Sequence, residues 1–287
     1  VTSFTPQTDG TPGGLIERCE SVSGASVGVT LASGGALGLC YQTHASEFAV
    51  RCGRLGTTPG TYADVADLGT NAGMLLGAGP NGFAGGLTTS ITGSRNLALQ
   101  TFDLNMNPLR TTPVASGEYP QFVGRVGSRW WLVRQPPVSR SALSIDRIGD
   151  DGSNAGTITV PLIGAAAATT APSISAVATA EGLTFTLAVG NELYLVTART
   201  DGTVGARRVF VDTAPVYANL VSYGTGWAVV LLRSAASATG VWTMRLDCRG
   251  AVTEAPVLVA SGSNLSLWGS TLDATGRGLW MVLVRTL

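Results

Sequence analysis

Mostly apolar runs of seven residues recur along the chain, and each run begins just after a glycine. The glycines are Gly35, Gly82, Gly127, Gly182, Gly226 and Gly278, and the runs read ALGLCYQ, FAGGLTT, SRWWLVR, LTFTLAV, WAVVLLR and LWMVLVR. Runs without clean alternation are typical of strands buried on both faces. They recur at intervals of roughly 48 residues, which indicates an architecture built from one repeated unit.

Polar turns and prolines mark the other strands of each unit. The turns are Thr8-Asp9-Gly10, Asp103 to Asn107, Asp150-Asp151-Gly152, Asp201-Gly202 and Asp247 to Gly250. Such turns supply the positive-φ positions that tight hairpins require. The prolines in Tyr119-Pro120, Ala171-Pro172 and Ala214-Pro215 suit the first residue of an innermost strand. Each unit therefore has room for four antiparallel strands.

The two ends of the chain complement each other. No further strand follows the last apolar run at 279–285, while the first residues contain a strand, an Asp-Gly turn and a second strand. This N-terminal pattern matches Leu193 to Val209, where the turn aligns directly. We therefore expect the N-terminal strands to complete the sheet that the C-terminal strands begin. Such a pairing closes a ring and removes two free sheet edges.

The prediction is an all-β fold, a six-bladed β-propeller forming one domain over residues 1–287. The expected blades are 21–69, 70–116, 117–164, 165–212, 213–261, and 262–287 joined to 1–20. A two-sheet sandwich is the alternative, but a sandwich would not require the N-terminal strands to complete the sheet that the C-terminal strands begin. A β-prism would require units of three strands.

The pattern resembles secreted bacterial six-bladed β-propellers over the whole chain. The resemblance is to the architecture and not to one family. The Gly-His…Trp-Asp signature of WD40 repeats, the double glycine of kelch repeats and the Ser-x-Asp-x-Gly-x-x-Trp box of sialidases are all absent from the sequence.

Composition excludes several classes of function. The chain has 18 arginines and no lysine, 18 acidic residues and a single histidine, His44. A formal net charge of zero gives no basic surface for nucleic acid. Schiff-base chemistry and multi-histidine metal sites are excluded as well. No apolar run approaches the 18 or more residues of a membrane span.

The first residue, Val1, suggests a removed signal peptide and a secreted, extracellular or periplasmic location.

Four cysteines fit two disulfides in an oxidising compartment. Cys40 and Cys52 flank the expected hairpin turn at 42–47, so we predict that they pair. Cys19 and Cys248 are then paired by elimination. The alternative is four buried free thiols.

A calcium site is one candidate for function. Six-bladed lactonases and related esterases, which this pattern resembles, place Ca²⁺ at the propeller axis on asparagine and acidic oxygens. The loops expected near the axis hold comparable residues in four blades, namely Asn71, Glu118, Asn219 and Asn264. Oxygen ligands of this kind suit calcium. The alternative is that these residues simply populate turns, and a site with one carboxylate supplies little charge.

Arginines and aromatic residues are candidates for ligand binding. Arg134, Arg233 and Arg285 each follow a blade glycine by seven residues, and together they would bind an anion. Tyr119, Tyr217 and Trp268 lie in or beside the expected axial loops, where they would stack on sugar rings. The alternatives are that the arginines end buried strands and extend to water, and that the aromatic residues pack between blades.

Two classes of function remain open. The first is a non-enzymatic binding or assembly module that recognises a protein or a glycan, within a larger assembly in one version, and that needs no cofactor. The second is a lactonase-like or esterase-like hydrolase that uses the axial Ca²⁺. A sialidase-like hydrolase is a more remote third, because its acid boxes and Tyr–Glu pair cannot be placed in the sequence.

Overall fold

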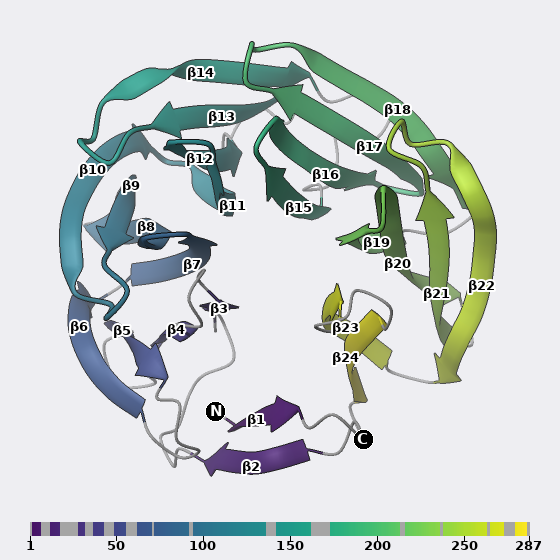
Figure 1. Ribbon diagram of the computed structural model, residues 1–287, viewed down its shortest axis with the longest axis horizontal. Helices are drawn as coiled ribbons and strands as arrows, with labels where there is room; N and C mark the ends of the chain where they lie inside the picture. Colours follow the sequence, from purple (N-terminus) through teal and green to yellow (C-terminus); the bar gives the residue numbers. More distant parts are fainter. Residues whose placement is uncertain are drawn as a thin grey trace. The chain divides into compact units, whose positions relative to one another are not determined.

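The chain is described by a computed structural model. It describes residues 2–6, 12–17, 28–31, 37–42, 49–55, 62–70, 72–91, 94–135, 142–161, 173–212, 216–235, 238–262, 265–272 and 279–285. All regular secondary structure in these ranges is β-strand, as expected from the sequence (Figure 1). Within the same ranges, no helix is long and apolar enough to cross a membrane.

Five antiparallel sheets of four strands dominate the structure. The first two are β3 Gly28–Leu31, β4 Leu37–Gln42, β5 Ala49–Leu55, β6 Tyr62–Thr70, and β7 Ala72–Gly79, β8 Gly82–Ile91, β9 Ser94–Phe102, β10 Pro108–Ser116. The third is β11 Tyr119–Val126, β12 Arg129–Gln135, β13 Ala142–Ile148, β14 Asn154–Pro161. The last two are β15 Ser173–Thr179, β16 Gly182–Val189, β17 Glu192–Arg199, β18 Val204–Val211, and β19 Val216–Tyr223, β20 Gly226–Ala235, β21 Ala238–Leu246, β22 Val252–Gly262. In every sheet each strand pairs with the next along the chain.

Two pairs of strands remain at the ends of the chain. β1 Thr2–Pro6 pairs with β2 Pro12–Glu17, and β23 Leu265–Leu272 pairs with β24 Leu279–Arg285. Among the described strands, no pairing joins either of the first two to either of the last two. The all-β architecture of four-stranded sheets is confirmed, whereas the sixth blade and the closed ring stay predictions.

The strands form two compact units, which are described separately. Unit 1 comprises Val1–Pro137 and Ser144–Thr157, and unit 2 comprises Val138–Leu143 and Ile158–Leu287. Both include parts of β13 and β14. The single domain over 1–287 therefore stays a prediction.

The glycines that open the second strand of a sheet allow close contact with the third strand. A Cβ atom on Gly82 would lie 2.2 Å from the carbonyl oxygen of Phe102, and one on Gly226 would lie 2.2 Å from that of Leu246. Gly182 has the same relation to Ala198, at 2.1 Å. A side chain cannot be placed at such distances, so these glycines recur for a steric reason.

Gly127 does not belong to this set, although the sequence pattern placed it there. It lies in the turn before β12 with φ of 55°, and Arg129 opens the strand instead. As a consequence, Arg134 is the sixth residue of β12 and Arg233 is the eighth of β20. The predicted equivalence of these two arginines is therefore wrong by two residues, because it was counted from glycines with different roles.

Each unit has an apolar core formed by strands from neighbouring sheets. In unit 1, Phe83, Met106 and the Cys40–Cys52 pair belong to one buried cluster. In unit 2, Leu195, Leu220, Val229 and Met244 belong to another. Every residue of β16 is buried, as expected for a second strand that is covered on both faces.

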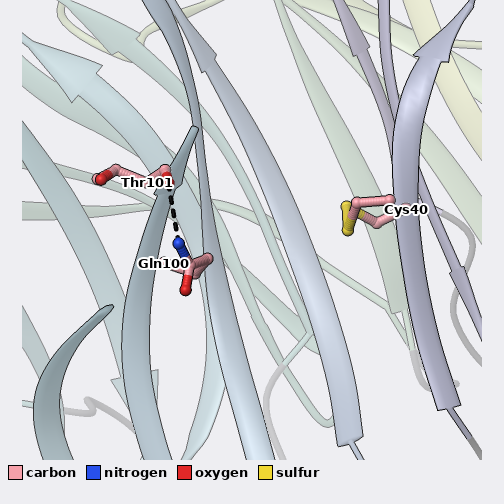
Figure 2. The surroundings of a disulfide bond; sticks show 4 residues. Cys40, Gln100 and Thr101 are labelled. Atoms are coloured by element: carbon pink, nitrogen blue, oxygen red, sulfur yellow. Dashed lines mark hydrogen bonds between the residues drawn. A yellow bond between two sulfur atoms is a disulfide. The ribbon is translucent and has the colours of Figure 1, made fainter. Parts of the chain in front are cut away.

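The predicted Cys40–Cys52 disulfide is confirmed. The two cysteines face each other across β4 and β5, and their side chains are buried (Figure 2). Elsewhere in the same unit, Gln100 is buried with its polar groups paired: its side-chain amide donates to the carbonyl of Thr101 over 2.9 Å, and its side-chain carbonyl accepts from Thr111.

The predicted Cys19–Cys248 disulfide is wrong. Cys248 carries a free, exposed thiol, and Cys19 lies outside the described residues. Elimination failed here because an even number of cysteines does not require every cysteine to pair. Cys248 instead occupies the turn between β21 and β22.

Candidate functional site

One pocket lies between two neighbouring sheets in each unit. The unit 1 pocket, of about 370 Å³, lies between sheets β7–β10 and β11–β14, and its polar wall consists of Asn81, Thr101, Arg110, Arg125, Trp130 and Asp150. The unit 2 pocket, of about 700 Å³, lies between sheets β15–β18 and β19–β22. Its wall includes Glu181, Arg199, Arg207, Trp227, Cys248 and Arg249.

The two pockets occupy equivalent places in the repeat. Trp130 is the second residue of β12 and pairs with Ile148, the last residue of β13. Trp227 is the second residue of β20 and pairs with Leu246, the last residue of β21. Each indole therefore sits at the start of the second strand, beside the turn that joins the third and fourth strands.

The turns themselves share one hydrogen-bond pattern. In unit 1, the Gly149 N–H donates to the Ser153 carbonyl, and the Gly152 N–H donates to the Gly149 carbonyl. In unit 2, Asp247 and Gly250 take the places of these two glycines, with Ala251 in place of Ser153. The φ angles of Gly152 and Gly250 are 80° and 77°. It follows that Asp150 and Cys248 hold the same position, as do Asp151 and Arg249.

The first strand of each sheet supplies a further equivalent pair. Arg125 pairs with Trp130 across β11 and β12, and Ser222 pairs with Trp227 across β19 and β20. On the other wall, the arginine of an outer strand lies against the turn glycine of the next sheet. This arginine is Arg110 in unit 1 and Arg207 in unit 2.

The unit 1 pocket contains its own carboxylate. Arg125 donates two hydrogen bonds to Asp150, at 2.5 and 2.8 Å, and the Trp130 Nε1–H donates to the same carboxylate at 3.0 Å. The Arg125 guanidinium also lies 5.0 Å from the centre of the Trp130 ring. The hydrogen bonds from Arg125 hold the pKa of the Asp150 carboxyl below its ordinary value, although burial acts in the opposite direction.

The unit 2 pocket lacks this carboxylate. The Trp227 Nε1–H is buried and has no hydrogen-bond partner among the described residues. A thiol, Cys248, stands where Asp150 stands in unit 1, and a third arginine, Arg249, replaces Asp151. A buried donor without an acceptor costs about 1–3 kcal/mol, so such a group in a native protein calls for an explanation.

Arg134, one of the predicted anion-binding arginines, is neutralised within its own sheet. It donates to Glu118, which directly precedes β11, and to Asp146 on β13 at 2.5 Å. Asp146 is 1% exposed and also accepts from Thr157. Burial disfavours the charged guanidinium, but the hydrogen bonds to Asp146 and Glu118 outweigh it and raise the pKa of Arg134.

Arg233 is held in a comparable way. Its guanidinium donates to both carboxylate oxygens of Asp212, which directly follows β18, and lies 4.8 Å from the centre of the Trp242 ring. Arg285, the third predicted arginine, ends β24, and its side chain lies outside the described structure. Both described arginines thus fix the chain that leads into the first strand of their sheet, so binding of an external anion by them stays a prediction.

The predicted aromatic residues are placed as follows. Tyr119 opens β11, is 43% exposed and lies under the Arg95 guanidinium at 4.3 Å. Tyr217 is 54% exposed and lies in β19, not in a loop as the sequence suggested, because the strand begins directly after Pro215. Trp268 lies in β23, with its side chain outside the described structure.

Two of the four predicted calcium ligands lie within the described residues. Glu118 is paired with Arg134, and Asn219 lies in β19 of the other unit. Asn71 and Asn264 lie outside the described residues. Within the described ranges, no three acidic, histidine or cysteine side chains are clustered so as to hold a metal ion. The axial calcium site therefore stays a prediction.

The two pockets were not predicted from the sequence. The expected ligand sites lay near the propeller axis instead. A local signal was present, because Trp130 and Trp227 each lie in an apolar run, and the turn residues Asp150 and Cys248 follow them by about 20 residues. What the sequence did not reveal was the strand register that brings the two together.

Comparison with known proteins supports the fold. No protein-family model and no curated protein sequence matches the chain. Among solved structures, it is similar to a subtype N10 neuraminidase-like protein of A/little yellow-shouldered bat/Guatemala/060/2010, with 10% identity, a TM-score of 0.55 and coverage of 95% of this chain and 88% of that one.

It is also similar to the α-L-arabinanase of Penicillium chrysogenum, described in complex with arabinobiose. The identity is 12%, the TM-score is 0.54, and the match covers 99% of this chain and 97% of the arabinanase. A puromycin hydrolase matches with 9% identity and a TM-score of 0.50, and the chain covers 46% of its length. At such low identity the likeness concerns the fold alone. The chain is all-β, with the four-stranded antiparallel sheets of a β-propeller.

Proposed function

We propose that the protein is a β-propeller that binds glycans at pockets repeated between neighbouring sheets. The observation that carries the proposal is the equivalence of the unit 1 and unit 2 pockets, each with a tryptophan at the start of a second strand and arginines around it. Recurrence of one pocket on a repeated scaffold is the arrangement expected of a multivalent binding module.

The chemistry of the pocket walls suits a sugar. An indole offers an apolar face for the C–H side of a pyranose ring, and an N–H for a hydroxyl or carboxylate oxygen. Arginine and threonine side chains, such as Arg110 and Thr101 in unit 1, supply further polar partners. Volumes of about 370 and 700 Å³ fall in the range of small-ligand sites.

The proposal includes the closed six-bladed ring and export from the cell. Six blades would place further pockets of the same kind around the ring. The Cys40–Cys52 disulfide is of the type that persists in oxidising compartments, where a glycan-binding protein meets its ligands. A non-enzymatic role agrees with this picture, since the polar groups of the unit 1 pocket are engaged with one another.

A glycan array followed by calorimetric titration of the best ligand tests this function. We expect binding with a stoichiometry above one, and loss of one class of sites in Trp227→Ala. Trp242→Ala is the matched control, because Trp242 belongs to the same sheet but lies outside the pocket wall. An array without any ligand, or full binding by Trp227→Ala, would contradict the proposal.

A hydrolase is the second candidate, favoured by the similarity to an arabinanase described with a bound sugar. In this version an axial Ca²⁺ is held by Asn71, Glu118, Asn219 and Asn264. Metal analysis of the purified protein, with hydrolysis of arabino-oligosaccharides before and after chelation, tests it. A metal-free protein without hydrolytic activity would remove this candidate and leave the binding module.

A further inference from the structure

The two pockets carry different residues at equivalent positions of the repeat, and the difference indicates a ligand. In unit 1 the Trp130 indole donates to an internal carboxylate, that of Asp150, which Arg125 also binds. In unit 2 the equivalent of Asp150 is Cys248 and the equivalent of Arg125 is Ser222. The internal carboxylate and its arginine are thus both missing, while the indole donor remains.

We propose that the unit 2 pocket binds a carboxylate of an external ligand, an acidic sugar of the hexuronate type. This inference rests on the proposed glycan-binding function and specifies the ligand of one of its pockets. The ligand carboxylate takes the place that Asp150 takes in unit 1. It accepts from the Trp227 Nε1–H, which has no partner among the described residues.

The charges of the pocket wall agree with an anionic ligand. Three arginines, Arg199, Arg207 and Arg249, face one acidic residue, Glu181. Arg207 and Arg249 form no ion pair with any described residue, whereas Arg125 in unit 1 is bound by Asp150. Guanidinium groups bind carboxylates with two parallel hydrogen bonds, so these arginines match the proposed ligand.

The size of the pocket allows the rest of the sugar to enter. Its volume of about 700 Å³ is nearly twice that of the unit 1 pocket, where Arg125 and Asp150 fill part of the space. Because the Trp227 N–H is shielded from solvent, a side chain of the wall has to move when the ligand binds. Arginine side chains have the rotamer freedom for such a movement.

Conversion of the unit 2 pocket to the unit 1 arrangement gives the sharpest test. In Cys248→Asp, an internal carboxylate competes with the ligand for the indole and the arginines. We expect glucuronate to bind this variant at least tenfold more weakly than the wild type, and the ligand-free variant to unfold at a higher temperature. Cys248→Val is the matched control, because it enlarges the side chain at the same position without offering the indole an acceptor or a charge, and it should bind within about threefold of the wild type.

Removal of the cations tests the other half of the site. Arg249→Gln and Arg207→Gln should each weaken glucuronate binding about tenfold or more. Arg208→Gln is the control, because Arg208 is the neighbour of Arg207 but pairs with Glu192 outside the pocket. In ¹H–¹⁵N spectra, the indole signal that disappears in Trp227→Phe should shift downfield when glucuronate is added to the wild type.

Three ligands separate failure of this inference from failure of the proposed function. Tight binding of glucuronate, with weak binding of glucose and acetate, supports both. Equal binding of glucose and glucuronate keeps the glycan-binding function but overturns the carboxylate assignment. Equal binding of acetate and glucuronate keeps the carboxylate and overturns the sugar. Unchanged glucuronate affinity in Cys248→Asp, or no binding of any of the three, overturns the inference.

Discussion

At the scale of single residues, Arg134 shows how the protein uses its few charges. Its guanidinium joins Glu118, just before β11, to Asp146 on β13, and only 2% of the Asp146 side chain is exposed. One cation therefore compensates a nearly buried carboxylate and also fixes the start of the first strand. A buried charge tolerates loss of its partner poorly, since the remaining charge has no solvent to stabilise it.

Replacement of Arg134 by methionine should lower the free energy of unfolding by about 3 kcal/mol or more. The reason is that Asp146 and Glu118 are left in a largely buried site without a cation. Urea denaturation measures the change. Arg129→Met on the same strand is the control, because Arg129 is exposed and its replacement should cost less than about 0.5 kcal/mol. Equal losses in the two variants would show that the ion pairs of Arg134 add nothing to the free energy of unfolding.

The turn aspartates predict how stability depends on pH. The pKa of Asp151 is lowered by hydrogen bonds from Ser153, and that of Asp201 by hydrogen bonds from Thr203. Burial would raise the pKa of Asp103, but hydrogen bonds from Asn107 and Asn105 outweigh it. A carboxyl whose pKa is lower in the folded state adds stability above its unfolded pKa, and this is lost as the pH falls through the folded value.

The free energy of unfolding should therefore fall as the pH drops below about 4 and stay nearly flat between pH 5 and 7. In Asp150→Asn, which keeps an acceptor for Trp130 but cannot ionise, the fall below pH 4 should be shallower. Urea titrations at several pH values measure both curves. Identical slopes for wild type and variant would contradict the assignment of a lowered pKa to Asp150.

At the scale of the strands, the repeat is maintained by contacts between the second and third strands of a sheet. Gly226 lies so close to the carbonyl of Leu246 that no Cβ fits between them, and Gly82 and Gly182 occupy the same place in their sheets. The glycine that opens β8, β16 and β20 is thus a steric requirement, and not only a flexible turn residue.

Gly226→Ala should lower the free energy of unfolding by about 1–3 kcal/mol, as insertion of an atom into a closely packed site does. Gly205→Ala is the control, since a Cβ at Gly205 would contact nothing and the residue lies on an outer strand. Thermal unfolding of both variants measures the difference. If Gly226→Ala were as stable as Gly205→Ala, the close approach of the two strands would not be required.

Strands and turns were predictable from the sequence because their signals are local. The run after Gly182 and the turn at Asp201-Gly202 each lie within ten residues, and both are where the pattern placed them. The Cys40–Cys52 pair was predictable for the same reason, as one hairpin joins the two cysteines. The pockets were not, because the contact between Trp130 and Asp150 depends on the register of a whole sheet.

At the scale of the whole molecule, the two-stranded pairs at the ends differ from the five four-stranded sheets between them. β1 and β2 belong to unit 1, and β23 and β24 belong to unit 2. A sheet of two strands leaves backbone donors and acceptors unpaired along both edges, and such edges promote aggregation. A joint four-stranded sheet would satisfy most of these groups and would give six sheets of equal size.

A circular permutant tests this closure. The chain would begin between β14 and β15, and a six-residue linker would join the old ends. A linker of this length reaches across at most about 20 Å. If β1 and β2 complete the sheet of β23 and β24, this permutant should be monomeric and should unfold within about 1 kcal/mol of the wild type in urea. A matched permutant with a twenty-residue linker is the control, because it can fold even with distant ends. If the permutant with the twenty-residue linker folded and the one with the six-residue linker did not, the closed ring would be contradicted. In a closed ring the gap between the old ends is short enough for six residues.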